Sequence, residues 1–270
     1  RDRNILEKAF ASSQKAWEHP GLLHMYIHLM EMSPNPEKAL LHGDKLVSLV
    51  PDSGHLVHMA THIDVLCGDY QNVVSRNHQA TEVDKKFVNY AGAENFYTVY
   101  RVHNLHFKIY GAMFLAQPTP ALSAANQLKE ILPENVVRLI PELFEAFIPM
   151  NLHVMVRFGK WREILLEEFP EDKELYSFTT TMLHYAKAIA LANIGEKRDA
   201  KRELKNFIIA KDKVQEERNV FNNSCADVLN VAEKMVLGEV FYKSGEIEKG
   251  LDYLRQSVKL DDELLYDEPW

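Results

Sequence analysis

Cysteine is nearly absent from this chain of 270 residues, which contains only Cys67 and Cys225. The two lie far apart among residues typical of helices, so the sequence predicts neither a disulfide framework nor a zinc site built from thiolates. So few cysteines are typical of proteins in a reducing compartment, and we therefore expect a cytoplasmic location.

Long hydrophobic runs and an excess of basic charge are also lacking. The longest apolar runs, such as residues 188–192, are far too short to span a bilayer, and the first residues do not resemble a signal peptide. Lys and Arg number 31 against 39 Asp and Glu, and the resulting net charge of −8 argues against a nucleic-acid partner held through its phosphates. We thus expect no membrane span and no nucleic-acid partner. The chain opens on Arg1 rather than on Met, so we expect it to be a fragment of a longer protein.

What the chain does contain is helical periodicity. Almost every segment carries apolar residues at spacings of three and four, as amphipathic helices do, and none shows the sustained alternation of a strand. Gly, Pro and Ser interrupt these segments at regular distances, which indicates short turns between helices. The breaks fall at 19–21, 33–36, 51–54, 68–70, 117–120, 158–160, 193–195 and 244–246. The sequence therefore predicts an all-α fold.

A histidine cassette occurs twice. Leu22-Leu23-His24-Met25-Tyr26-Ile27-His28 is followed 34 residues later by Leu56-Val57-His58-Met59-Ala60-Thr61-His62, with Leu, His, Met and His at matching positions. A period of about 34 residues is the length of a repeat built from two helices. The cassette therefore predicts helical repeats at the start of the chain.

Two turns near the C-terminal end carry a family resemblance. Residues 241–251 place Gly245 between two helices with Gly250 soon after it, and residues 192–200 repeat this pattern around Gly195. Both resemble the turn of a tetratricopeptide repeat. Segments 19–51 and 52–85 match the full repeat spacing, whereas 93–133 and 138–170 match more loosely. The resemblance implies a right-handed superhelix of about six helical hairpins, forming a single domain over 1–270 whose concave groove is lined by the first helix of each pair.

The histidines are concentrated in the first part of the chain. Ten of the twelve lie within the first 106 residues, and spacings of three or four place neighbouring pairs on one helical face. The resemblance places His24 with His28, His58 with His62, and His106 with Tyr110 at equivalent positions facing the groove. His55 and His103 lie one turn earlier on their helices. The other five histidines are not candidate ligands: His19 lies at a predicted helix start, and His42, His78, His153 and His184 lie elsewhere.

Imidazoles on neighbouring helices can bind a zinc, iron or copper ion. The candidate ligands are His24, His28, His55, His58, His62, His103 and His106, with Glu31 as a candidate oxygen ligand. An open coordination position would add metal-assisted hydrolysis or oxygen chemistry, so a metal-dependent enzyme is one alternative. No His-Glu-x-x-His motif or other catalytic signature is present.

Two further interpretations remain open. The histidines can simply satisfy one another by hydrogen bonds. The groove can also bind a small ligand, a peptide or a partner protein, as a scaffold does, through ring contacts and hydrogen bonds. The candidate groove residues are Tyr26, Tyr97, Tyr100, Arg101, Tyr110 and Arg157. Histidines stand where the carboxylate clamp of the tetratricopeptide family has lysine, asparagine and arginine, which disfavours chaperone C-terminal tails as ligands.

Overall fold

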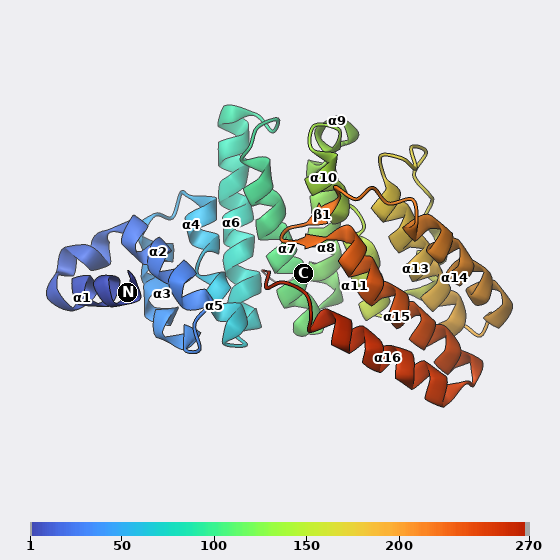
Figure 1. Ribbon diagram of the computed structural model, residues 1–270. Coiled ribbons are helices and arrows are strands. Elements are labelled where there is room, and N and C mark those ends of the chain that lie inside the picture. Colours follow the sequence, from blue (N-terminus) through green and yellow to red (C-terminus); the bar gives the residue numbers. More distant parts are fainter. Residues whose placement is uncertain (1, 268–270) are drawn as a thin grey trace. The chain divides into compact units, whose positions relative to one another are not determined.

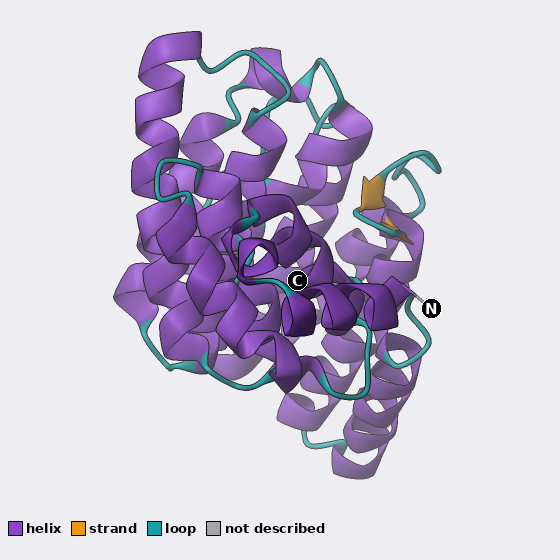
Figure 2. Cartoon of the chain, turned by 90° about the vertical axis from the view of Figure 1, so that its left-hand side faces the viewer, coloured by secondary structure: helices purple, strands orange, loops and turns teal. Residues whose placement is uncertain are grey.

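The structure, a computed structural model, describes residues 2–267 and is mostly helical (Figure 1). The only strands among these residues are β1 (Asn219–Val220) and β2 (Asn223–Ser224), which pair antiparallel in a small hairpin (Figure 2). The all-α prediction is therefore confirmed for the described part of the chain. The hairpin was missed because two-residue strands are too short to show a period of two.

The chain divides into two compact units, with the boundary after Gln127. The elements of the first unit are α1 (Asp2–Ser12), η1 (Gln14–Glu18), α2 (Pro20–Glu31), η2 (Pro36–Ala39), α3 (Leu40–Leu49), α4 (Gly54–His58), α5 (Thr61–Leu66), α6 (Tyr70–Ala91), α7 (Thr98–Phe114) and most of α8 (Pro118–Ile131). The prediction of one continuous domain over 1–270 stays a prediction.

The second unit holds the remaining elements. They are α9 (Glu134–Val137), α10 (Pro141–Phe144), η3 (Glu145–Phe147), α11 (Met150–Arg157), α12 (Trp161–Leu166), α13 (Ser177–Asn193), α14 (Lys197–Lys211), the two strands, α15 (Cys225–Ser244) and α16 (Ile247–Asp261). The pairs α13–α14 and α15–α16 pack along their lengths as hairpins (Figure 1).

The turns of these two hairpins are built as their sequences predict. Gly195 and Gly245 have φ values of 92° and 97°, which L-residues with a side chain rarely adopt. Gly250 then allows close approach of the helices, because a Cβ there would lie 2.6 Å from the backbone nitrogen of Tyr242. The helical hairpins are thus observed, whereas their membership of a superhelix stays a prediction.

The first unit is organised around a hydrophobic core beneath α2. The buried members are Phe10, Ala16, Leu23, Tyr26, Ile27, Met30, Ala39, Leu46, Met59 and Ile63. Helix α2 starts at Pro20, and Nδ1 of the preceding His19 accepts a hydrogen bond from the backbone N–H of Leu22 (3.3 Å). The structure therefore confirms the predicted break at 19–21, where α2 begins. One face of α2 packs on this core, and the other face points away from it.

Helix α4 is held close to α6 and α7 by a buried carboxylate. Asp84 of α6 accepts hydrogen bonds from the hydroxyl of Tyr97 (2.7 Å) and the amide of Asn104 (2.8 Å), and its side chain packs against Gly54 at the start of α4. Ser53 occupies the N-cap position but its side chain makes no capping hydrogen bond. Contact with α6 therefore fixes the start of α4.

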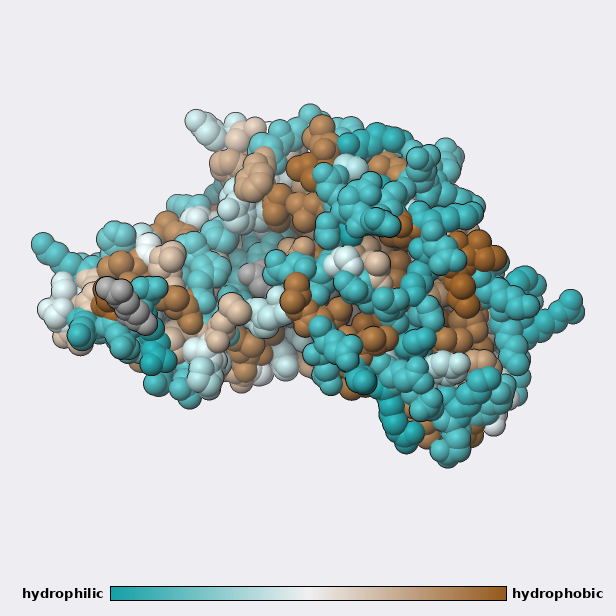
Figure 3. Space-filling model, viewed as in Figure 1, coloured by the Kyte–Doolittle hydropathy of each residue, from teal (hydrophilic) through white to brown (hydrophobic). Residues whose placement is uncertain are grey.

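No helix among the described residues is long and apolar enough to cross a membrane. On the face shown in Figure 3, hydrophilic residues cover much of the helical surface near the C-terminal end, and hydrophobic residues show between them.

We predict that Gly54→Ala lowers the free energy of unfolding by about 1–3 kcal/mol, as overpacking does. The new Cβ would collide with Asp84 Oδ1, which Tyr97 and Asn104 prevent from moving, and would lie 3.0 Å from the Ala80 carbonyl oxygen. Urea unfolding measures the change. The matched control is Gly21→Ala, whose Cβ meets only the side chain of His19; equal stability of the two variants would contradict the packing argument.

Candidate metal centre

Six of the seven predicted ligand histidines meet in the first unit. His24 and His28 lie on α2, His55 and His58 on α4, His62 on α5 and His103 on α7. Five rings form a closed circuit, with centroid separations of 4.8 Å (His58–His62), 5.5 Å (His62–His28), 4.9 Å (His28–His24), 5.1 Å (His24–His55) and 6.2 Å (His55–His58). The structure thus gathers imidazoles from four helices into one cluster.

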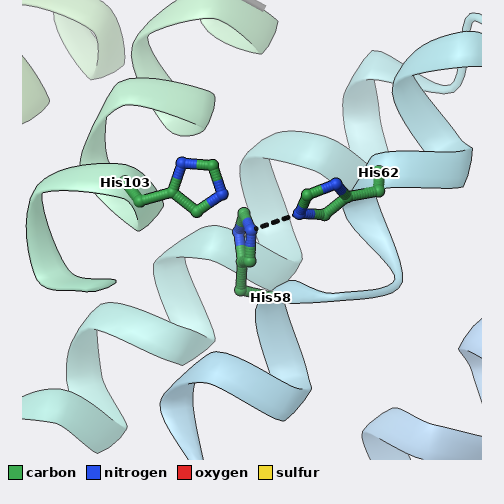
Figure 4. A group of neighbouring side chains, drawn as sticks. All are labelled: His58, His62 and His103. Atoms are coloured by element: carbon green, nitrogen blue, oxygen red, sulfur yellow. Dashed lines mark hydrogen bonds between the residues drawn. The ribbon is translucent and has the colours of Figure 1, made fainter. Parts of the chain in front are cut away.

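Three of these histidines form the buried part of the cluster, which we call the inner triad: His58, His62 and His103 (Figure 4). One ligand atom from each lies within 4.8 Å of the other two. The His103 ring is 4.5 Å from that of His58 and 5.5 Å from that of His62, and the three residues are at most 8% exposed. The triad is therefore a candidate set of metal ligands withdrawn from water.

A break in the helix lies between the two histidines of the second cassette. Our sequence interpretation places His58 and His62 on one helical face, but Met59 and Ala60 separate α4 from α5. The Thr61 hydroxyl donates to the carbonyl oxygen of His58 (2.7 Å), while the backbone N–H of His62 bonds to Met59 (3.3 Å). This tighter turn, of the 3₁₀ type, still brings the two rings together, edge to face at 79°.

The hydrogen bonds of Asn77 determine which nitrogen of His58 carries hydrogen. Nδ1 of His58 lies 2.7 Å from Asn77 Oδ1, and the Asn77 amide nitrogen donates to the carbonyl oxygen of Val73 (2.8 Å). The amide cannot be turned around, because its oxygen would then face the Val73 oxygen. The acceptor facing His58 is therefore an oxygen, Nδ1 carries the hydrogen, and the Nε2 of the neutral ring bears a lone pair.

Glu31 plays the corresponding role for His62. Its Oε1 lies 2.9 Å from Nδ1 of His62, and its Oε2 lies 3.4 Å from Nδ1 of His28. A carboxylate only accepts hydrogen bonds, so Nδ1 of His62 carries hydrogen, while His28 lies at ion-pair distance. Glu31 and these two histidines also converge within 4.8 Å as a candidate ligand set. The Nδ1 contacts instead favour Glu31 as the group that orients two imidazoles, as carboxylates behind metal-binding histidines do.

The two Nε2 atoms of His58 and His62 consequently face each other 2.9 Å apart, joined by the dashed line in Figure 4. With hydrogen on both Nδ1 atoms, two neutral rings would present a lone pair to a lone pair. The contact is attractive only with a cation between or on these atoms, either an additional proton on one ring or a metal ion. The geometry therefore defines a cation-binding pair.

Apolar surroundings keep this region dry. The ring of Phe107, fully buried, lies 4.8–4.9 Å from the rings of all three members of the inner triad. Burial lowers the pKa of His58 well below its ordinary value of 6.5, and His103 and His62 lower it further. His58 is therefore a neutral imidazole at neutral pH, the form in which histidine binds metals.

The remaining histidines of the cluster lie nearer to solvent. His24 and His28, which we call the outer pair, place their Nε2 atoms 3.1 Å apart, and the His28 side chain is 41% exposed. His55 packs on Tyr100, with ring centroids 4.5 Å apart. Burial, with His24 and His103 as further causes, lowers the pKa of His55 to about 3. The cluster thus runs from exposed to fully buried imidazoles.

The other predicted site residues are placed elsewhere. His106 is buried on α7, and the convergent ligand sets of the described residues do not include it. Tyr26 points into the hydrophobic core and its hydroxyl donates a hydrogen bond to Glu7 (3.2 Å), so it does not line a groove.

The remaining predicted groove residues have various surroundings. Tyr97 donates a hydrogen bond to Asp84, and Arg101 interacts electrostatically with both. Tyr110 packs on Phe114 (4.7 Å), and Arg157 is exposed on α11 of the second unit. Of the six predicted groove residues, Tyr100 alone has a ring contact with the cluster among the described interactions.

His19 lies at the start of α2, and the other four histidines that are not candidate ligands also have surroundings of their own. His42 stacks on Trp17 (4.3 Å) in the core, the side chain of His78 is 61% exposed on α6, and His184 pairs with Glu203 (2.7 Å). Burial lowers the pKa of His153, on α11, to about 4. None of them belongs to a convergent ligand set of the described residues.

Sequence reasoning missed Asn77 and Phe107. Phe107 follows His103 by four residues, so helical spacing could have placed it on the same face. Asn77 lies 19 residues after His58 on another helix, and its role depends on how α6 packs against α4. No local pattern in the sequence points to it.

Comparison with known proteins yields no match to this chain among protein-family models, curated proteins or solved structures. The site's geometry therefore carries the functional argument.

We predict that the ring of His55 stays neutral at pH 5, because its pKa is lowered to about 3. The pKa of His58 is lowered well below 6.5, so we expect its ring to take up a proton only at a lower pH than a solvated histidine does. A solvated histidine is half protonated near pH 6.5. As the pH falls below that value, the unfolded chain takes up protons that these folded rings do not, so each costs stability, at most about 1.4 kcal/mol per pH unit.

NMR titration of the ring C–H signals measures the protonation, with a peptide of residues 54–62 as the solvated reference. Half-protonation of either ring near pH 6.5 in the folded protein would contradict its burial in a dry cluster.

Proposed function

We propose that this protein binds a transition-metal ion through the inner triad, with Asn77 and Glu31 orienting His58 and His62. One observation carries the proposal: the Nε2 atoms of these two rings lie 2.9 Å apart while both Nδ1 atoms face oxygen acceptors. Histidines that bind metals characteristically donate the other ring N–H to a carboxylate or carbonyl oxygen. This arrangement directs both lone pairs at one point.

The distances suit a transition metal after small side-chain movements. Two imidazole nitrogens bound to zinc at about 2.0–2.1 Å in tetrahedral geometry lie about 3.3 Å apart. The His58–His62 separation is 2.9 Å, and the third ligand atom lies within 4.8 Å. Three neutral imidazoles suit zinc, iron or copper, the ions that the sequence suggested.

A shared proton is the simpler way to satisfy two facing nitrogens. Burial disfavours the charge of a proton and of a metal ion alike, and Glu31, 2.9 Å from His62 Nδ1, helps to balance either. The third histidine favours a metal, because a proton between two rings gives no role to His103, whose ring lies 4.5 Å from His58. A metal ion uses all three imidazoles.

The proposal includes a tetratricopeptide-like architecture as the scaffold of the site. Its support is the pair of hairpins α13–α14 and α15–α16, with left-handed glycines in their turns, and the recurrence of the histidine cassette after 34 residues. In such a scaffold the concave groove would carry the histidines on successive first helices.

Metal-dependent catalysis is the second candidate function. Three protein ligands with a fourth position for water are typical of catalytic zinc, and the inner triad offers three. The test is hydrolysis of an activated ester, p-nitrophenyl acetate, by zinc-loaded protein. Equal rates for wild type and a zinc-treated His103→Asn variant would exclude catalysis at this site.

We predict that the protein, stripped with a chelator and reloaded, binds one zinc, iron(II) or copper(II) ion in the inner triad. His103→Asn should weaken binding by at least about 100-fold, more than changes behind the ligands do. At 100 times Kd the metal should raise the free energy of unfolding by about 2.7 kcal/mol in wild type. Elemental analysis gives stoichiometry and calorimetry gives affinity.

The matched control is His42→Asn, which changes another buried histidine outside the cluster. It should bind the ion as wild type does. If folded wild-type protein binds none of the three ions, the proposal fails, and binding of a peptide or partner protein in the groove becomes the alternative to test.

We predict that Glu31→Gln weakens metal binding by about 10–100-fold. The amide offers one oxygen acceptor where the carboxylate offers two, so it cannot face the Nδ1 atoms of both His62 and His28 with an oxygen. Competition with a chromophoric chelator measures the affinity. Unchanged affinity would contradict the orienting role, and complete loss of binding would make Glu31 a ligand instead.

A further inference from the structure

The inner triad raises a problem of access. Its members are at most 8% exposed, so an ion in water does not meet them directly. A buried metal site requires a path by which the ion arrives. The outer pair lies on the solvent side of the same cluster, with the His28 side chain 41% exposed.

The outer pair repeats the close contact of two Nε2 atoms that is found in the inner site. Its Nε2 atoms lie 3.1 Å apart, as against 2.9 Å for His58 and His62. Glu31 stands between the two sites, with one carboxylate oxygen toward Nδ1 of His28 and the other toward Nδ1 of His62. One buried carboxylate therefore orients one histidine of each pair. Two imidazoles at the surface make a weaker site than three in the interior.

The two sites touch directly, since the rings of His28 and His62 lie 5.5 Å apart, but the Nδ1 atoms of both rings face Glu31. His55 provides a second connection. Its ring is 5.1 Å from His24 and 6.2 Å from His58, and its buried Nδ1 has no hydrogen-bond partner among the described residues. Ring-to-ring steps of 5–6 Å thus connect the solvent side with the interior.

We propose that the outer pair is a second, weaker metal site that takes up the ion from solution and passes it by way of His55 to the inner triad. The inference rests on the proposed function, since it needs an inner site that binds metal. It concerns the rate of loading, whereas the proposed function concerns the bound state.

The two roles have different kinetic consequences. A residue on the path does not change Kd of the inner site, because it does not hold the bound ion. Since Kd is the ratio of the rate constants of release and loading, such a residue changes both by the same factor. A ligand of the inner site changes Kd itself. His24→Ala is the sharpest variant, because it disrupts the outer pair and leaves the contact between His28 and Glu31 in place.

The experiment is stopped-flow loading of chelator-stripped protein with cobalt(II), followed by the visible absorption of the ion, and release to excess EDTA. We expect His24→Ala and His55→Phe to slow loading and release at least tenfold at unchanged inner-site Kd. Wild type should bind a second, weaker equivalent that His24→Ala lacks. The controls are Met25→Ala, an exposed neighbour on α2, and His78→Ala, an exposed histidine on α6; both should behave as wild type.

The outcomes separate the two proposals. Normal loading of the inner site in His24→Ala, with wild-type rates, would overturn the uptake path and leave the proposed function intact. A changed Kd in His24→Ala would also overturn it, by making His24 part of the inner site. Absence of any bound ion in wild type would overturn both proposals.

Discussion

The contact between the Nε2 atoms of His58 and His62 depends on two hydrogen-bond acceptors that lie at the other nitrogen of each ring. Asn77 and Glu31 hold the Nδ1 hydrogens of the two rings, and this fixes where the lone pairs point. If either acceptor were a donor, one ring would turn its hydrogen inward and the pair would be a simple hydrogen bond. The chemistry of the cluster is therefore decided by the hydrogen-bonding groups behind it.

Those acceptors are in place because of the packing of four helices. Asn77 lies on α6, Glu31 at the end of α2, and the rings they orient on α4 and α5. Asp84 holds α6, α7 and the start of α4 together, while the core beneath α2 fixes the helix that carries Glu31. Helix packing is rigid and close, so it can hold side chains within a few tenths of an ångström.

The two units arrange their helices differently. In the second unit, long hairpins with left-handed glycines in their turns pack regularly, and its two histidines stand apart from any convergent ligand set of the described residues. In the first unit, α4 and α5 are short and interrupted, and the interruption falls between two clustered histidines. The irregular helices thus coincide with the cluster, as local departures from regular geometry often do at functional sites.

The sequence by itself determined the helical class, the glycine turns at Gly195 and Gly245, the start of α2 and the concentration of histidines in the first part of the chain. These features depend on local periodicity and on residues three or four apart. The tertiary structure decided which histidines meet. In the folded chain His103, and not His106, converges with His58 and His62. Tyr26 lies in the core, and Asn77 and Phe107 contact the clustered rings. Such choices depend on the rotation of each helix about its axis and on contacts between distant residues, which the spacing along one helix does not encode.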